Sequence, residues 1–307
     1  MKVTLDDMSA YFGTSSFNNQ FIDLFNEFDW EYEQLNSEQQ MSEVLKLLQH
    51  IRSDKQKVGD PCRTKVWDEG WDENLQEFLR SGDLKALVPK YYFRGGLIRF
   101  RDKFINPRCN FFELNYFKIL QNFIFRKYFS EYDNIYEFGC GSGINIAALC
   151  NMFPNKKLYG CDFVQSSVDI VDVISDKLKA NVEGVLFDMS NPSYNFKIAP
   201  RSCVLTCGSV EQIPNSFKQF IDYLVYNKVE LCCHIEPCIE LYDENNIVDM
   251  TAILFHEKRG YTIGLLSYLE NLETESKISI IYKKPALVGS RRMEGYNIIV
   301  WKCNYQK

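Results

Sequence analysis

I-Y-E-F-G-C-G-S-G, residues 135–143, is the stretch around which the chain is organised. Apolar residues lead into Gly139, Gly141 and Gly143, and the apolar residues of 144–149 then follow at helical spacing. This order predicts a strand, a tight turn and a helix. Alternate glycines let a ligand approach the main chain, and the start of the helix offers unpaired N–H groups. The stretch predicts a small-ligand site, with a purely structural turn as the alternative.

An acidic residue follows the next predicted strand. Residues 157–161 have strand character and lead into Asp162, about one βαβ unit beyond the glycines. An acid at this distance can accept both hydroxyls of a ribose. The pair of signals therefore favours a nucleotide-type ligand.

Three segments resemble motifs of the class I S-adenosylmethionine-dependent methyltransferases: 137–143 (E-F-G-C-G-S-G), 160–163 (G-C-D-F) and 186–189 (L-F-D-M). The resemblance covers roughly residues 131–307 and favours this donor over NAD, whose fingerprint needs a glycine at Ile144. It implies that S-adenosyl-L-methionine is the cofactor. The residues expected to contact it are Glu137, Gly139, Cys140, Gly141, Gly143, Asp162, Phe163, Asp188, Met189 and Cys207.

The composition is that of a globular protein. The 307 residues are 46% hydrophobic and 15% aromatic, enough for a packed core. A formal charge of -6 argues against nucleic acid as a partner, because binding phosphates needs a basic surface. The 11 cysteines are odd in number, and Cys161, Cys203, Cys232 and Cys233 fall in predicted interior strands. Together with the lack of a signal peptide or a membrane-spanning run, they predict reduced thiols, a cytoplasmic location and no membrane partner.

Two regions are predicted. Residues 1–130 should form a helical N-terminal cap, and residues 131–307 an α/β, Rossmann-like, doubly wound, mostly parallel seven-stranded sheet. In the cap, a capping box at Ser37–Gln40 should start one helix, and others are predicted near 72–80 and 111–129. The strands expected are 134–138, 157–161, 182–187, 202–207, 228–235, 278–282 and 296–302, and the helices between them are 144–152, 164–179 and 215–226.

The candidate catalytic residues follow the fourth and fifth predicted strands, because ligands of such sheets bind outside the carboxyl ends of the strands. Methyl transfer to an alcohol needs a base, and His234 is predicted to be that base, with Glu236 and Glu211 orienting it or the acceptor. His234 could instead be a hydrogen-bonded interior histidine, and Glu236 could simply start the following helix. Cys207 is more typical of a small core residue than of a nucleophile. No metal is expected, because these strand ends carry Cys207 and His234 rather than convergent carboxylates.

His256, Arg259 and Tyr261 are expected to close over the acceptor. Arg94 lies where tyrosines and cations adjoin the pair Gly95-Gly96, a combination that suits a phosphate or a sugar nucleotide. In both places solvated charges are the alternative interpretation.

Segments at 205–214, 234–237, 256–261 and 294–301 also resemble a narrower group, bacterial sugar O-methyltransferases encoded with surface-polysaccharide (capsule or lipopolysaccharide) genes, although Gly208 stands where a polar residue is expected. This resemblance implies O-methylation of a small-molecule sugar acceptor, which could be nucleotide-linked, by an enzyme that could be a homo-oligomer. Three alternatives stay open: methylation of another small acceptor (a phosphate-type oxygen, an amine or a natural product), an NAD(P)-dependent oxidoreductase, and a non-catalytic S-adenosylmethionine-binding partner.

Overall fold

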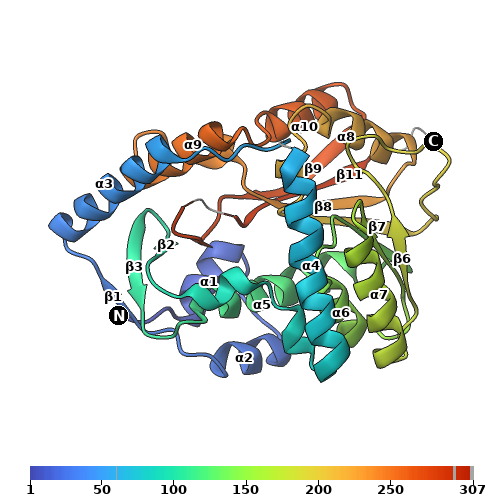
Figure 1. The fold of residues 1–307 in the computed structure, drawn as a ribbon, viewed down its shortest axis with the longest axis horizontal. Coiled ribbons are helices and arrows are strands. Elements are labelled where there is room, and N and C mark those ends of the chain that lie inside the picture. Colours follow the sequence, from blue (N-terminus) through green and yellow to red (C-terminus); the bar gives the residue numbers. More distant parts are fainter. Residues whose placement is uncertain (60, 293–294, 305–307) are drawn as a thin grey trace.

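A seven-stranded sheet forms the centre of the molecule (Figure 1). The computed structural model describes residues 1–59, 61–292 and 295–304. The strand order is β6-β5-β4-β7-β8-β11-β9, in which β6 to β8 are parallel and β11 is antiparallel to both of its neighbours. The strands are β4 (Asn134–Phe138), β5 (Lys157–Asp162), β6 (Val182–Leu186), β7 (Ser202–Cys207), β8 (Leu231–Glu236), β9 (Ile278–Lys284) and β11 (Asn297–Cys303). This sheet confirms the predicted fold class.

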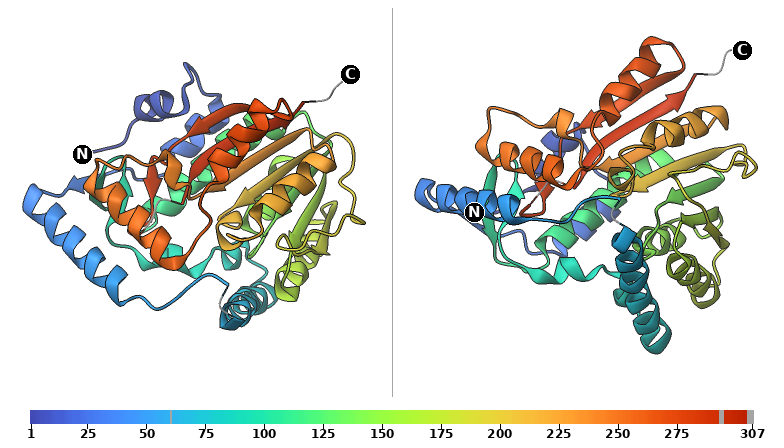
Figure 2. Two further views of the ribbon diagram at one scale, coloured as in Figure 1. Left: turned by 90° about the horizontal axis from the view of Figure 1, so that it is seen from above. Right: turned by 45° about the horizontal axis from the view of Figure 1, so that its top comes forward.

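Helices cover both faces of the sheet because its strands are apolar on both sides (Figure 2). The first face packs against α5 (Phe112–Ile124), α6 (Ile144–Met152) and α7 (Gln165–Leu178). The second face packs against α8 (Phe217–Tyr226) and α10 (Leu265–Thr274). Cys203, Cys232 and Cys233 are fully buried in this core, as their interior strands predict.

The register assigns each strand residue to one face. Glu137 pairs with Leu205, and Leu205 pairs with Cys233, so these three side chains share the first face. Thr206 pairs with His234, and both lie on the second face, beside the layer of α8 and α10. This alternation decides which candidate residues can reach one cavity.

The N-terminal region contains a sheet that the sequence does not predict. β1 (Tyr32–Gln34), β3 (Lys103–Pro107), β2 (Ile98–Phe100) and β10 (Val288–Gly289) form a four-stranded antiparallel sheet in that order. Since β10 lies between β9 and β11 in the chain, this sheet joins the two ends of the sequence. The main core likewise includes residues from Val3 to Val300, and the division near residue 130 stays a prediction.

The remaining elements surround these two sheets. They are α1 (Leu5–Phe12), α2 (Asn19–Asn26), α3 (Ser37–Ser53), α4 (Pro61–Ser81), α9 (Ile247–Arg259) and the short helical turns η1 (Leu84–Leu87), η2 (Lys90–Arg94), η3 (Phe125–Phe129), η4 (Val210–Gln212) and η5 (Ile239–Leu241). The cap of α3 is Asn36 rather than Ser37: Asn36 and Gln39 exchange hydrogen bonds of 2.9 Å, one residue before the predicted capping box. Among the described helices, none combines the length and apolar character needed to cross a membrane.

Candidate active site

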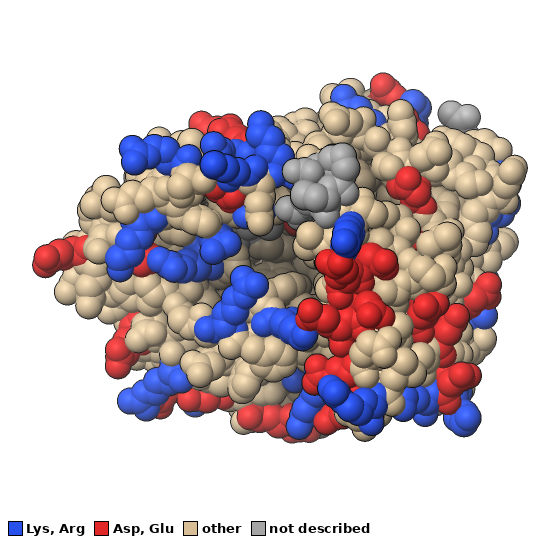
Figure 3. Space-filling view, in the orientation of Figure 1, with Lys and Arg blue, Asp and Glu red and all other residues tan. Residues whose placement is uncertain are grey.

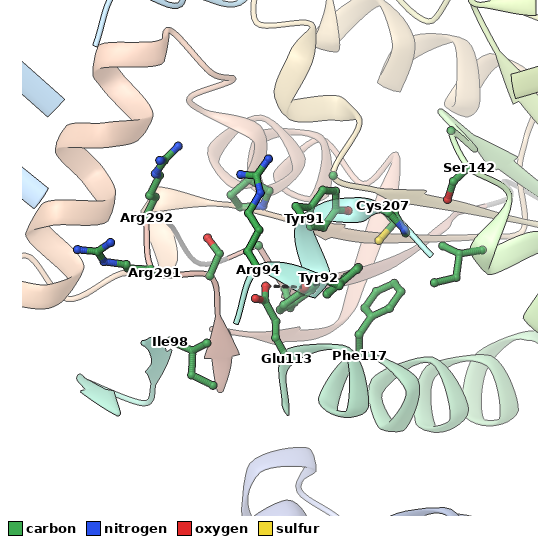
Figure 4. Close-up of a pocket in the computed structure, with 18 of the residues that line it drawn as sticks. Tyr91, Tyr92, Arg94, Ile98, Glu113, Phe117, Ser142, Cys207, Arg291 and Arg292 are labelled. Carbon is green, nitrogen blue, oxygen red and sulfur yellow. Dashed lines mark hydrogen bonds between the residues drawn. The ribbon is translucent and has the colours of Figure 1, made fainter. Parts of the chain in front are cut away.

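A cavity of about 470 Å³ opens on the first face of the sheet, at the carboxyl ends of β4 and β7 (Figure 4). Its floor is the glycine turn after β4 together with Cys207, Gly208 and Glu211, which follow β7. Its walls come from α4, η2, α5 and, between β10 and β11, residues 290–292 and 295–296. The cavity therefore lies where the strand-end rule predicts a ligand, but much of its wall comes from outside the sheet.

The glycine turn is held in a conformation that side chains would disrupt. Gly139 has a φ of 74°, and a Cβ placed there would lie 2.3 Å from that of Ser209. A Cβ on Gly141 would lie 3.0 Å from the ring of Trp71, which α4 places against the turn. The main chain is thus exposed to a ligand on one side and packed tightly on the other.

Glu137 brings a carboxyl group to the floor of the cavity. The side chain is 1% exposed, and its Oε1 accepts a hydrogen bond of 2.6 Å from Asn145 Nδ2, while Gln121 Nε2 donates to Asn145 Oδ1. Its other oxygen has no hydrogen-bond partner among the described residues. Burial raises the pKa of Glu137 to about 8; the Asn145 hydrogen bond opposes this shift and the charge of Asp162 adds to it. A buried carboxyl with one unused oxygen is suited to a cationic ligand group.

Not every residue predicted to contact a donor lines this cavity. Glu137, Gly139, Cys140, Gly141 and Cys207 do so. Gly143, Asp162, Phe163, Asp188 and Met189 do not.

Asp162 stabilises the glycine turn through a hydrogen bond to its main chain. Its Oδ2 accepts from the Gly141 N–H at 2.9 Å and its Oδ1 from the Val164 N–H at 3.2 Å. The residue is 4% exposed, and burial raises its pKa while these main-chain hydrogen bonds oppose the shift. The carboxylate of Asp188 likewise accepts from the N–H and the hydroxyl of Ser190, two residues further on, at 2.7 Å each. The carboxylates of both acids are thus already hydrogen-bonded to other groups of the protein.

The prediction that His234 is the catalytic base is wrong on geometry, because His234 lies on the opposite face of the sheet from the cavity. It is fully buried, Trp301 Nε1 donates to its Nε2 at 2.9 Å, and its Nδ1 lies 2.8 Å from Thr206 Oγ1. The Trp301 bond places the proton of the neutral ring on Nδ1, which donates to Thr206. Burial lowers the pKa of His234 to about 3. The interior-histidine alternative describes this residue.

Of the two glutamates predicted to assist the base, Glu211 lines the cavity and Glu236 does not. Glu236 is 1% exposed and lies outside the cavity; its Oε1 accepts from the N–H groups of Ser209 and Val210 at 3.1 Å each. It therefore fixes the loop after β7 rather than contacting an acceptor. Glu211 does line the cavity, and its Oε1 accepts from Gln212 Nε2 at 2.7 Å. Cys207 also lines the cavity, but burial raises its thiol pKa, which disfavours a nucleophilic role.

His256, Arg259 and Tyr261 do not line the cavity either. His256 is fully buried, and its Nε2 lies 2.7 Å from the Thr262 carbonyl oxygen. Arg259 forms a buried ion pair of 2.6 Å with Asp54, which ties the end of α9 to the segment after α3. The predicted lid is thus a packing contact between helices. Arg94, by contrast, does line the cavity, at its mouth (Figure 4).

Sequence reasoning missed Glu113, a carboxyl group of the cavity whose properties suit a general base. It extends from α5 into the cavity, and the hydroxyl of Tyr296 donates to it at 2.9 Å; Tyr296 in turn lies 2.8 Å from the hydroxyl of Tyr92 (Figure 4). Burial raises the pKa of Glu113 to about 7, against the effect of the Tyr296 hydrogen bond. The available signal was a lone acid in the first turn of a mostly apolar helix.

Comparisons with known proteins give only distant similarities. No family model matches the chain, and no curated protein matches it. Similar solved structures include a SAM-dependent methyltransferase from Aquifex aeolicus, with 13% identity and a TM-score of 0.41 over 60% of this chain and 88% of that one. PigF with SAH has 12% identity and a TM-score of 0.46, covering 86% of this chain and 69% of its own. The S-adenosylmethionine-dependent methyltransferase SibL in its apo form has 14% identity and a TM-score of 0.45, covering 85% and 74%.

Proposed function

We propose that the protein is an S-adenosylmethionine-dependent methyltransferase that methylates a hydroxyl group of a small polar acceptor. The observation that carries the proposal is the pairing of a glycine turn at the carboxyl end of β4 with the buried carboxyl of Glu137, a residue of the cavity lining whose second oxygen has no hydrogen-bond partner among the described residues. The motif resemblance adds the expectation that the acceptor is a sugar or a nucleotide-linked sugar.

The residues around the turn fit the amino-acid end of the donor. Glu137 can accept its ammonium group, and the start of α6 offers main-chain N–H groups to its carboxylate. Asp162 is engaged with Gly141 and Val164, so it would act on a ribose only after its loop had rearranged or through further lone pairs. When bound, S-adenosylmethionine supplies an electrophilic methyl group.

The remaining task of the protein is to take a proton from the acceptor hydroxyl. Glu113 is suited to it, because a carboxyl with a pKa of about 7 is partly ionised at neutral pH and can still hold the proton that it accepts. Tyr296 fixes its orientation through a hydrogen bond. Glu211, in the floor of the same cavity, can orient the hydroxyl group. We therefore assign the base to Glu113 in place of His234.

The test begins with binding. Calorimetric titration of the purified chain with S-adenosylhomocysteine, the demethylated product, should give stoichiometric binding that Glu137→Ala weakens. Mass spectrometry with labelled donor and a panel of sugars, sugar phosphates and nucleotide sugars should then show the gain of one methyl group. Binding of NAD or NADP without binding of S-adenosylhomocysteine would contradict the proposal and support an oxidoreductase.

A further inference from the structure

Three arginines from distant parts of the chain meet at the mouth of the cavity. Arg94 ends η2, whereas Arg291 and Arg292 lie between β10 and β11, and all three line the same cavity (Figure 4). The face drawn in Figure 3 is hollowed near its centre, with Lys and Arg side chains along one side of the hollow and acidic side chains on the other. The chain as a whole carries a formal charge of -6, so the cationic mouth is a local feature.

The charges of these arginines are only partly balanced. Arg291 forms an ion pair with Glu43, but Arg94 and Arg292 form no ion pair with any residue that the structure describes. Burial lowers the pKa of Arg292, and the nearby positive charges of Arg259, Arg94 and Arg291 lower it further, against the opposing charge of Asp54. Gathering like charges in this way costs free energy, which an anionic ligand would recover.

The main chain beside Arg94 is shaped for this position. Gly95 has φ 59° and ψ -167°, a region that only glycine enters readily. A Cβ at Gly95 would also lie 3.1 Å from the side-chain oxygen of Asn110, another residue of the cavity wall. The turn that directly follows Arg94 is therefore specified by glycine.

The acidic and the basic residues of the cavity differ in their exposure. Glu137 and Glu211 are buried and Glu113 is half-buried, whereas Arg94, Arg291 and Arg292 are exposed, which places the positive charge at the mouth. We propose that this arginine mouth binds a phosphate group of the acceptor while the hydroxyl to be methylated reaches Glu113; the proposal rests on the function proposed above. A phosphate monoester offers three terminal oxygens, and the diphosphate of a nucleotide-linked sugar offers four non-bridging oxygens, to several guanidinium groups at once, whereas a carboxylate offers two. The acceptor class is thus a sugar phosphate or a nucleotide-linked sugar.

The experiment uses the whole chain and simple anions as probes. Binding of pyrophosphate, inorganic phosphate and acetate is measured by calorimetry at low ionic strength for the wild type and for the variants Arg94→Gln, Arg292→Gln and the double variant. Arg201→Gln is the matched control. Arg201 is exposed and lies just before the start of β7, whose other end, about 20 Å along the strand, borders the cavity. We expect pyrophosphate to bind the wild type and the control alike, and each cavity variant to lose at least tenfold in affinity.

Three results would overturn the proposal: absence of pyrophosphate binding to the wild type, equal affinity in the double variant, or acetate binding as tightly as phosphate. Binding of S-adenosylhomocysteine is measured in parallel and should be unchanged in every arginine variant. If the wild type fails to bind that product, the methyltransferase assignment fails separately, and loss of pyrophosphate binding in the arginine variants would still identify the anion site. The melting temperature of each variant establishes that it is folded.

Discussion

Glu137 gives the sharpest test of the donor site, because its ionisation should control binding. With a pKa of about 8, this carboxyl is mostly protonated near neutral pH in the free protein. A cationic ligand needs the ionised form, whose population falls from about half at pH 8 to about 3% at pH 6.5. The apparent affinity for S-adenosylhomocysteine should therefore fall by about 15-fold over this interval. Glu137→Gln should abolish that dependence and weaken binding at pH 8 by roughly tenfold to a hundredfold, the range for a charged hydrogen bond.

The assay is calorimetric titration in two buffers of different ionisation enthalpy, which counts the protons released on binding. The wild type should release up to about one proton more than Glu137→Gln at pH 6.5, and this difference cancels any titration of the ligand itself. The matched control is Glu183→Gln. Glu183 lies on the edge strand β6, forms an ion pair with Lys157, and its substitution should leave the wild-type behaviour unchanged. Equal pH dependence in the wild type and Glu137→Gln would refute the reasoning.

Three further outcomes are expected. His234→Ala should lower the free energy of unfolding by about 3 kcal/mol, because it opens a cavity and leaves the buried Trp301 N–H without its acceptor, while the folded protein keeps its kcat. Urea unfolding and turnover measure this, and lost turnover at full stability would contradict it. Glu113→Gln should reduce kcat about a hundredfold and remove the rise of rate with pH near 7. Tyr296→Phe should move that rise to higher pH, because it removes a hydrogen bond that lowers the pKa of Glu113. An unchanged pH profile in both variants would exclude Glu113 as the base. Gly95→Ala should destabilise the fold by about 1–3 kcal/mol in denaturant unfolding, whereas Gly70→Ala, in open space within α4, should stabilise it by about 0.5–1 kcal/mol; equal effects would argue against a glycine-specific turn.

The elements of the large sheet could be predicted because their signals are local. β4, α6 and β7 begin and end at the predicted residues, since apolar periodicity and glycines lie within each segment itself. The small sheet could not be predicted in this way. β2 has three residues and β10 only two, and their pairing joins Arg99 with Gly289, positions that no local pattern connects. The same long-range join brings Arg94 and Arg292 to one cavity, so the arginine mouth also has no local signature.

The residue predicted as the base, His234, lies outside the cavity for a related reason: local sequence does not fix the face of the sheet on which a side chain lies. The rule that ligands bind at the carboxyl ends of strands selected the loops after β7 and β8, both of which contribute to the cavity lining, but the rule does not say which way a side chain points. Since side chains alternate, a single step in register moves a residue from one face to the other. His234 pairs with Thr206, one position after the Leu205 that pairs with Glu137, so it faces α8 and Trp301 instead of the cavity.

That alternation also explains why the acid proposed as the base comes from α5. The cavity face of the sheet presents Glu137 and Cys207 at the strand ends, and the next strand, β8, presents apolar Ile235 there. With Glu137 beside the glycine turn, a second acid for the acceptor has to come from a neighbouring loop or from the layer above the sheet. Glu211 and Glu113 occupy these two positions, and Glu113 is the one held by a tyrosine that the C-terminal segment supplies. The substrate side of the cavity is therefore built by elements that pack on the sheet. Predicting it from sequence requires those elements to be considered together with the strands.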